Sequence, residues 1–288
     1  MTLHLSKLHA TGNDFLVHLA VDAGAPQLDA VTIAALCDRN RGIGADGLIT
    51  IGPGGDGADC TMTLRNADGG LAEMSGNGIR CLAWVAARAG LGTPDEIVVD
   101  TAAGRRVVVL ERDSDGEVVA ADVDMGPVTF EPGRIPIDAP SALHLEATVD
   151  DVVYAGDAAG MGNPHFVVFV ADPAVTPVTR HGPVIERDAR FPRRVNVEFV
   201  AVAGPDRLTM RVWERGAGET QSCGTGACAA AAVAHRRALV GERVHVDVRG
   251  GSLTVALGET IRLGGPVVHV FDVDIPHERL LRALARTT

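Results

Sequence analysis

The feature that most constrains the fold of this chain is an internal duplication built around two glycine-rich turns. TMTLRNADGGLAEMSGNG (residues 61–78) aligns without a gap on TMRVWERGAGETQSCGTG (209–226). Upstream, TGNDF (11–15) matches MGNPHF (161–166) at nearly the same spacing. Two marker pairs in the same order at nearly equal offsets predict two structural copies within one chain.

Both copies show the same order of expected elements: a strand, a Gly-Asn turn, further strands, and a glycine-rich loop that opens into a helix. Helices are expected over 29–39, 77–89, 180–189 and 225–239. Because strands outnumber helices and do not alternate with them one for one, the sequence predicts an α+β fold rather than a doubly wound sheet.

A chain of 288 residues is long enough for two domains. We expect an N-terminal domain over 1–125 and a C-terminal domain over 126–268, and a tail over 269–288 that returns a last strand to the first domain. The Pro- and Gly-rich segment 126–142 is interpreted as the linker. Two such pseudo-symmetric domains facing each other would place the two turns on opposite sides of one cleft.

Charge and cysteine content exclude several classes of function. The net charge of −11, without a basic tract, argues against binding to nucleic acid or to an anionic membrane surface. No apolar stretch of about 18 residues suggests a membrane span. The first residues lack a secretory signal pattern, and five cysteines without metal-type spacing are typical of reduced thiols, so a cytoplasmic protein is expected.

Lysine usage bears on the cofactor. Lys7 is the only lysine in the chain, and it falls on the first predicted strand. Pyridoxal-phosphate enzymes need a lysine to form the Schiff base. Chemistry at an amino-acid α-carbon is therefore expected to proceed here with no cofactor.

The second turn, CGTGACA, carries the strongest chemical signal. Cys223 is expected at the start of a helix, where unpaired N–H groups and the helix dipole lower a thiol pKa and attract a carboxylate. Gly224 and Gly226 would let a ligand approach the backbone. The simpler reading is that Cys223 is a small buried side chain and that Ser75, in the first copy, is only a helix cap.

Two nucleotide-binding alternatives are weaker. GTGACA (224–229) fits the dinucleotide pattern G-x-G-x-x-A, with Asp247 at the ribose-binding spacing, but GAGETQS separates it from the preceding strand. RGIGADG (41–47) is glycine-rich like a phosphate loop, yet no Gly-Lys-Ser or Gly-Lys-Thr follows.

Polar residues near the turns are candidates for reading a zwitterion. Glu214 and Arg215 could bind an ammonium and a carboxylate, or form a surface ion pair. The segment MGNPHF supplies Asn163 and His165. Neutral donors and acceptors, each of which could instead be a turn residue, are Asn13, Asn66, Asn77 and Asn196.

Taken together, these motifs resemble the diaminopimelate epimerase family, within the wider group that includes the proline racemases. The motifs that carry the resemblance span nearly the whole chain and occur in family order: TGNDF, RGIGADG, RNADGG, EMSGNGIRC, MGNPH, VNVEF, ERGAGET and CGTGACA. The resemblance implies two similar domains, each a curved, mostly antiparallel sheet wrapped around a central helix. It also implies an active site between them, no cofactor, and two cysteines that exchange the α-proton of LL- and meso-diaminopimelate in lysine and cell-wall synthesis.

The resemblance also implies roles for individual residues. Cys223 is one acid/base, flanked by His165 and Glu214, and the backbone at Gly76-Asn77 and Gly224-Thr225 holds the substrate carboxylate. Residues expected to contact the substrate are Asn13, Asn66, Asn163, Asn196, Glu214 and Arg215. Members of the family are commonly dimers, so a homodimer is compatible with the resemblance.

Ser75 departs from the family pattern, because it stands where the second cysteine is expected. A hydroxyl is several pKa units more basic than a thiol, and Cys81 lies too deep in the helix to replace it. Three explanations stay open: an engineered replacement, a natural serine that serves one direction at reduced rate, or a relative with different chemistry. The alternatives are another racemase, an amino-acid dehydratase in which Cys223 is the single base, and an amino-acid-binding module without turnover.

Overall fold

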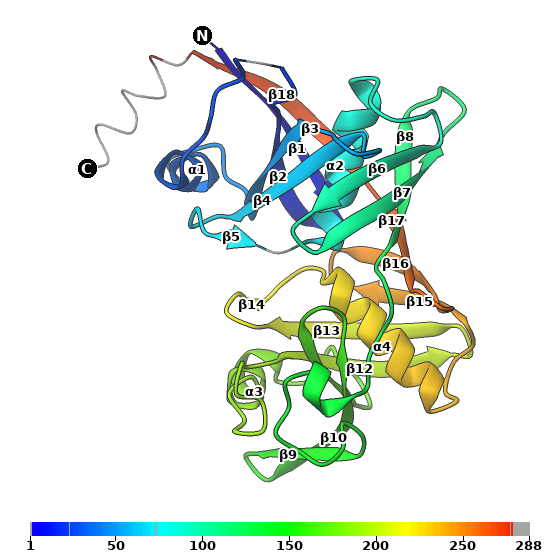
Figure 1. The fold of residues 1–288 in the computed structure, drawn as a ribbon. Helices are drawn as coiled ribbons and strands as arrows, with labels where there is room; N and C mark the ends of the chain where they lie inside the picture. Colours follow the sequence, from blue (N-terminus) through cyan, green and yellow to red (C-terminus); the bar gives the residue numbers. More distant parts are fainter. Residues whose placement is uncertain (1, 23, 73, 277, 279–288) are drawn as a thin grey trace. The chain divides into compact units, whose positions relative to one another are not determined.

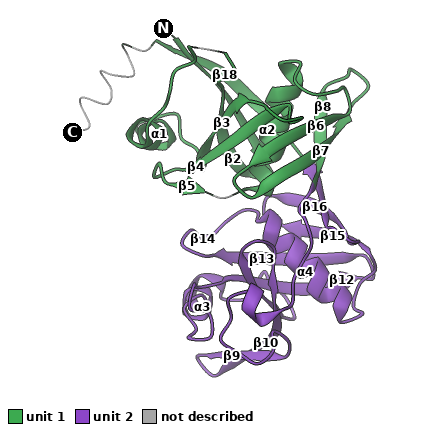
Figure 2. Ribbon diagram, in the orientation of Figure 1, with its two compact units in different colours: residues 1–123, 266–288 green, residues 124–265 purple. Residues whose placement is uncertain are grey.

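The computed structural model describes residues 2–22, 24–72, 74–276 and 278. The chain divides into two compact units: unit 1 comprises residues 1–123 and 266–288, and unit 2 comprises residues 124–265 (Figure 2). The boundaries expected from the sequence are 125/126 and 268/269. Of the expected C-terminal tail, residue 277 and residues 279–288 lie outside the described part.

Unit 1 is a mostly antiparallel sheet with the strand order β18-β1-β2-β3-β4-β6-β7-β8, and the short β5 also pairs with β4. Only β2–β3 and β4–β6 are parallel. Its elements are β1 (Thr2–Ala10), β2 (Asn13–Leu19), α1 (Ala30–Cys37), β3 (Gly47–Pro53), β4 (Cys60–Asn66), β5 (Leu71–Ala72), α2 (Gly76–Arg88), β6 (Glu96–Thr101), β7 (Gly104–Arg112), β8 (Val118–Asp124) and β18 (Val268–Pro276) (Figure 1).

Unit 2 has the strand order β9-β10-β11-β12-β13-β15-β16-β17, with β14 also paired to β13. Again two pairs are parallel, β11–β12 and β13–β15. Its elements are the 3-10 turn η1 (Pro132–Arg134), β9 (Leu145–Val149), β10 (Val152–Gly160), β11 (Pro164–Phe169), α3 (Val178–Ile185), β12 (Asn196–Gly204), β13 (Arg207–Glu214), β14 (Gly218–Glu219), α4 (Gly224–Arg236), β15 (Arg243–Val248), β16 (Gly251–Ala256) and β17 (Arg262–Pro266).

The two units therefore repeat one topology, strand for strand and helix for helix. In both, the parallel pairs occur at the same two points of the order. The place that β9 holds beside β10 in unit 2 is taken in unit 1 by β18, which pairs antiparallel with β1. The predicted α+β class with internally repeated architecture is confirmed.

A buried helix lies at the centre of each unit. Helix α2 contacts β1, β2, β3, β4, β6 and β7, and α4 contacts β10, β11, β12, β13, β15 and β16. The alanine-rich α4 is buried on nearly all sides, as expected of a helix without a polar face. Among the described residues, no helix has the length and apolarity needed to cross a membrane. All five cysteines are described, and none of them forms a disulfide.

The interpretation of segment 126–142 as a linker is wrong. Ile135, Ile137 and Ala142 are buried in the core of unit 2, in the same cluster as Phe166 and Phe199. Proline and glycine set the turns of this segment. Burying its apolar side chains in the core is nevertheless more favourable in free energy than leaving them exposed to water. The segment is consequently part of unit 2 and of its hydrophobic core.

Candidate active site

The turn of unit 2 places Cys223 at the N-terminus of α4. Cys223 is the N-cap, with an extended backbone (φ −124°, ψ 112°), and its sulfur accepts a hydrogen bond from the backbone N–H of Gly226 at 3.4 Å. The sulfur takes the place of the usual capping oxygen, so it points at the unpaired backbone N–H groups of the first helical turn. The residue is 5% exposed, so Cys223 is largely shielded from water.

The expectation that the helix terminus lowers the Cys223 pKa is wrong for this structure. Burial raises the pKa of the thiol well above its usual value, and the nearby carboxylates of Glu214 and Glu198 raise it further. The Thr225 hydroxyl and the Gly226 N–H act in the opposite direction but are outweighed. The resting form of Cys223 is consequently the thiol.

Glu214, at the end of β13, is a carboxyl group that interacts with the Cys223 thiol. Burial raises its pKa, and the neighbouring Glu198 adds to the rise, against hydrogen bonds from Thr220 and Cys223. Thr220 Oγ1 donates to Glu214 Oε1 at 2.5 Å. A carboxylate whose pKa is raised is a better proton acceptor, so Glu214 is placed to take the thiol proton.

A buried, hydrogen-bonded pair of side chains, His165 and Glu198, lies near the sulfur. His165 Nδ1 is 2.7 Å from Glu198 Oε1, and both side chains are completely buried. His165 Nε2 is 2.8 Å from Asn163 Oδ1. Glu198 was not expected from the sequence, although one signal was available: a single acidic residue at a buried position of β12, a strand that is apolar elsewhere after Asn196.

Asn196 and Glu186 fix the loop that carries Arg215. Asn196 Nδ2 donates to the Pro164 carbonyl at 2.9 Å, and its Oδ1 accepts from the Arg215 N–H at 2.8 Å. Glu186 accepts from the Gly216 N–H and from the Trp213 indole. The Arg215 side chain itself is exposed. Asn196 thus supports the loop by hydrogen bonds to the backbone.

Gly226 leaves no room for a larger side chain. A methyl group there would lie 2.8 Å from Glu198 Oε1 and 3.2 Å from Cys223 Sγ. We expect Gly226→Ala to displace the sulfur and to lower activity by at least about tenfold, even though alanine is the better helix former. The measurement is the steady-state rate alongside the thermal unfolding temperature. Gly133→Ala, where the added methyl meets nothing within 4 Å, is the matched control, and a fully active Gly226→Ala enzyme would contradict the prediction.

The turn of unit 1 repeats this geometry with oxygen in place of sulfur. Ser75 is the N-cap of α2 (φ −134°, ψ 121°), and its hydroxyl accepts from the Gly78 N–H at 3.0 Å. Gly76 and Asn77 are buried in the first turn. Asn77 Oδ1 accepts from the fully buried Arg80 at 2.8 Å, which fixes the amide.

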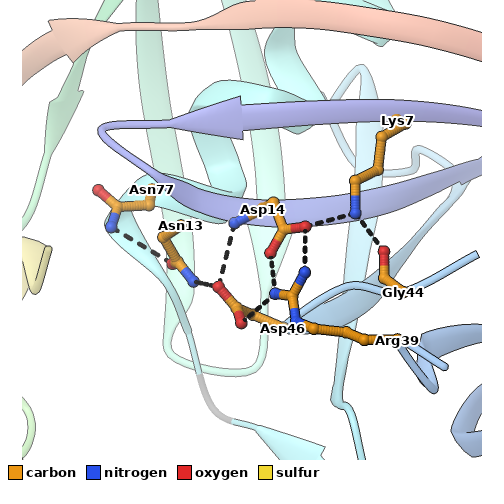
Figure 3. A network of polar contacts seen from close by, with 7 residues as sticks. All are labelled: Lys7, Asn13, Asp14, Arg39, Gly44, Asp46 and Asn77. Carbon is orange, nitrogen blue, oxygen red and sulfur yellow. Dashed lines mark hydrogen bonds and ion pairs between the residues drawn. The ribbon is translucent and has the colours of Figure 1, made fainter. Parts of the chain in front are cut away.

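Asn13 reaches this turn from the start of β2 (Figure 3). Asn77 Nδ2 donates to Asn13 Oδ1 at 3.3 Å, and Asn13 Nδ2 donates to Asp46 Oδ2 at 2.6 Å. Asp46 belongs to the RGIGADG motif, so the glycine-rich segment that was weighed as a phosphate loop instead holds Asn13. Asn66, the last residue of β4, is exposed and pairs in register with Gly47.

Beside Asn13, a network of charges joins Asp14 to two cations and to a backbone carbonyl (Figure 3). Arg39 bonds Asp14 Oδ1 at 2.5 Å and Asp46 Oδ1 at 2.8 Å. Lys7 binds Asp14 and the Gly44 carbonyl. The single lysine is therefore engaged in a structural ion pair.

We expect Asp14 to stabilise unit 1 in a pH-dependent manner. Burial opposes its ionisation, but hydrogen bonds from Arg39 and Lys7 outweigh burial and hold the Asp14 pKa at about 2 instead of 3.8. A depressed native pKa stabilises the fold above the unfolded value, and this stability is lost as pH falls from about 4 through 2. Asp14→Asn should cost about 2 kcal/mol at pH 7.

Urea unfolding of the wild type and Asp14→Asn between pH 2 and 7 measures this difference. The exposed pair Asp100–Arg105 supplies the control, since Asp100→Asn should change stability far less than Asp14→Asn does. A difference between wild type and Asp14→Asn that stays constant down to pH 2 would contradict the assignment.

The two turns differ in the side chains that pack against them. Val17 pairs with Ile49 in unit 1 as Val167 pairs with Glu198 in unit 2, so the two residues hold equivalent positions. A methyl group on Gly78 would meet Ile49, whereas one on Gly226 would meet Glu198. Unit 1 has an apolar side chain where unit 2 has a buried carboxylate.

Comparison with solved structures defines the class of fold. A hydroxyproline epimerase from Agrobacterium vitis matches with a TM-score of 0.69 at 19% identity, over 95% of this chain and 92% of that one. A phenazine biosynthesis protein of the PhzF family from Bacillus anthracis matches with a TM-score of 0.67 at 15% identity, over 96% and 99%. The architecture is the two-unit α+β fold of these proteins.

Sequence comparison then assigns the family. The family model for diaminopimelate epimerase matches residues 5–131 and 158–268. The diaminopimelate epimerase of Pelotomaculum thermopropionicum is 40% identical over 280 residues, covering 96% of this chain and 99% of that protein. This chain belongs to the diaminopimelate epimerase family, which confirms the resemblance carried by its motifs, and its family activity is that of an isomerase.

Proposed function

We propose that this protein interconverts LL- and meso-diaminopimelate by moving the α-proton from one face of the carbon to the other. The reaction serves lysine and peptidoglycan synthesis. The observation that carries the proposal is the equivalence of Cys223 and Ser75. Each is the N-cap of the buried helix at the centre of its unit. Full-length membership of the diaminopimelate epimerase family supports it.

Carboxylate binding and acid/base chemistry are assigned to the two turns. The first-turn N–H groups at Gly76-Asn77 and Gly224-Thr225 hold the α-carboxylate, because helix N-termini attract anions. Asn13, Asn66, Asn163 and Asn196 contact the substrate or hold the groups that do, together with Glu214 and Arg215. His165 supports the Cys223 thiol indirectly, through its hydrogen bonds to Glu198 and Asn163. No cofactor takes part in this proposal.

The protonation states give the direction of each step. Cys223 rests as a thiol, so it can protonate a carbanion directly. To act as a base it first passes its proton to Glu214, the carboxylate that it hydrogen-bonds, and the resulting thiolate removes the α-proton. Ser75 donates to, or relays a proton from, the opposite face. A two-base reaction requires Ser75 and Cys223 to reach the two faces of one α-carbon.

Proton exchange in heavy water tests the function. The dialysed protein with LL-diaminopimelate should yield meso-diaminopimelate that carries deuterium at the inverted carbon, without added pyridoxal phosphate. Release of water and a keto acid would instead identify a lyase with Cys223 as its single base. Thermal stabilisation by the ligand with no exchange would identify a binding module, and exchange with a different amino acid would reassign the substrate.

Two further assignments accompany this proposal. Five cysteines without a disulfide among them are suited to a reducing compartment, and we assign the protein to the cytoplasm. A homodimer is proposed from the family resemblance. Light scattering during size-exclusion chromatography measures the oligomeric state, and a monomer at micromolar concentration would contradict the homodimer.

A further inference from the structure

A chain of hydrogen bonds runs through unit 2 from Glu198 to the Cys223 sulfur. His165 bridges Glu198 Oε1 and Asn163 Oδ1, at 2.7 and 2.8 Å. Asn163 Nδ2 then donates to Thr225 Oγ1 at 3.4 Å, and Thr225 Oγ1 lies 3.5 Å from Cys223 Sγ. The chain links a fully buried carboxylate on β12 to the proposed base at the start of α4.

The direction of each hydrogen bond follows from the chemistry of its ends. An ionised carboxylate and an amide oxygen only accept, so a His165 ring that bonds both donates from both nitrogens. Asn163 presents its oxygen to the ring and therefore its NH₂ group to Thr225. A hydroxyl has a single hydrogen. Because Thr225 accepts from Asn163, its own hydrogen is available for the Cys223 sulfur.

Glu198 is buried, with His165 as the hydrogen-bond partner of its Oε1. Glu198 is 0% exposed, and its Oε2 has no hydrogen-bond partner among the described residues. An ionised carboxylate buried in this way is strongly destabilising unless its partner carries the opposite charge. The titratable groups gathered around the turn are Glu198 on β12, Glu214 on β13 and His165 on β11.

We propose that Glu198 is a positioning residue that, through His165, sets the direction of this chain so that Thr225 donates its hydrogen to the Cys223 sulfur. The proposal rests on the proposed function only in taking Cys223 as the base. A neutral residue at 198 removes this constraint. The ring can then lose a proton, and a ring whose Nε2 accepts turns the Asn163 amide, so that Thr225 donates to Asn163 instead of to sulfur.

The proposed chain of hydrogen bonds belongs to the turn of unit 2. The position equivalent to Glu198 in unit 1 is Ile49, and the position equivalent to His165 is Phe15, which pairs with Gly47 as His165 pairs with Asn196. A hydroxyl that donates to the capping atom is thus assigned to Cys223, where a thiolate must form. In unit 1, Ile49 and Phe15 hold the places of Glu198 and His165.

Nitrogen NMR of the full-length, substrate-free protein tests the charge of the ring. Protons are expected on both nitrogens of His165 at neutral pH, with the signal assigned by its absence from His165→Gln. Glu198→Gln should leave a proton on one nitrogen only, whereas Glu198→Asp should keep both. A wild-type ring with an unprotonated nitrogen would overturn the proposal. This result does not depend on catalysis, so it is separable from a failure of the proposed function.

A double-mutant cycle tests the path through Thr225. Glu198→Gln and Thr225→Val should each lower kcat by about tenfold with KM little changed, because hydrogen bonds to charged groups contribute about 1.5–3 kcal/mol. The double variant should lose no more than either single one. Thr225→Ser, which keeps the hydroxyl, should restore activity. Losses that multiply to about a hundredfold would overturn the proposal.

A matched control separates positioning from general stability. Asp157 is a buried carboxylate of unit 2 that pairs with Arg237 at 2.7 Å. Asp157→Asn should lower the unfolding temperature and leave kcat unchanged. If Asp157→Asn lowers kcat as Glu198→Gln does, the loss reflects stability and the proposal fails.

Discussion

Cys223→Ala is expected to abolish exchange of the substrate α-proton, with a loss of at least about a thousandfold. General acid–base catalysis by a positioned side chain contributes roughly 10²–10⁴-fold, and here the removed group also forms the reactive thiolate. Among the titratable groups around the turn of α4, the thiol is the one at the N-cap, beside the N–H groups assigned to the carboxylate. Glu214 would be left without the group whose proton it accepts.

The measurement is deuterium incorporation from heavy water at saturating LL-diaminopimelate. Cys228→Ala is the matched control, because Cys228 is a thiol buried within the same helix. The control should keep its exchange rate, apart from any loss of stability. Exchange retained in Cys223→Ala would remove this residue from the reaction and reassign the base.

Ser75→Cys is expected to raise the rate of epimerisation by about a hundredfold or more. Each pKa unit is about 1.36 kcal/mol, and a thiol is several units more acidic than a hydroxyl. Unit 1 offers the hydroxyl little help, since Ile49 and Phe15 hold the places of Glu198 and His165. Ser75→Ala, which removes the proton carrier but also the helix cap, should lose inversion and about 1 kcal/mol of stability.

Initial rates in both directions measure the effect, with circular dichroism to follow the stability of each variant. An unchanged or lower rate in Ser75→Cys would mean that the site is adapted to serine.

The sequence by itself determined the repeat, the α+β class and the candidate turns. The signals for these features are local in the sequence: the periodic strands, the glycine turns and the two duplicated markers. Each follows from backbone geometry or from the burial of one face of a strand or helix. The family motifs placed Cys223, His165, Asn163 and Glu214 in one group, and the structure brings these four together in unit 2. The four expected helices all form.

Burial and long-range pairing were decided only by the tertiary structure. The segment 126–142 packs in the core, because its apolar side chains find partners far along the chain. The Cys223 pKa rises rather than falls, because desolvation and two carboxylates outweigh the helix terminus. Glu198 is identified only when β11 and β12 lie side by side. A local pattern can name a reactive group, but its charge state depends on neighbours that the fold supplies.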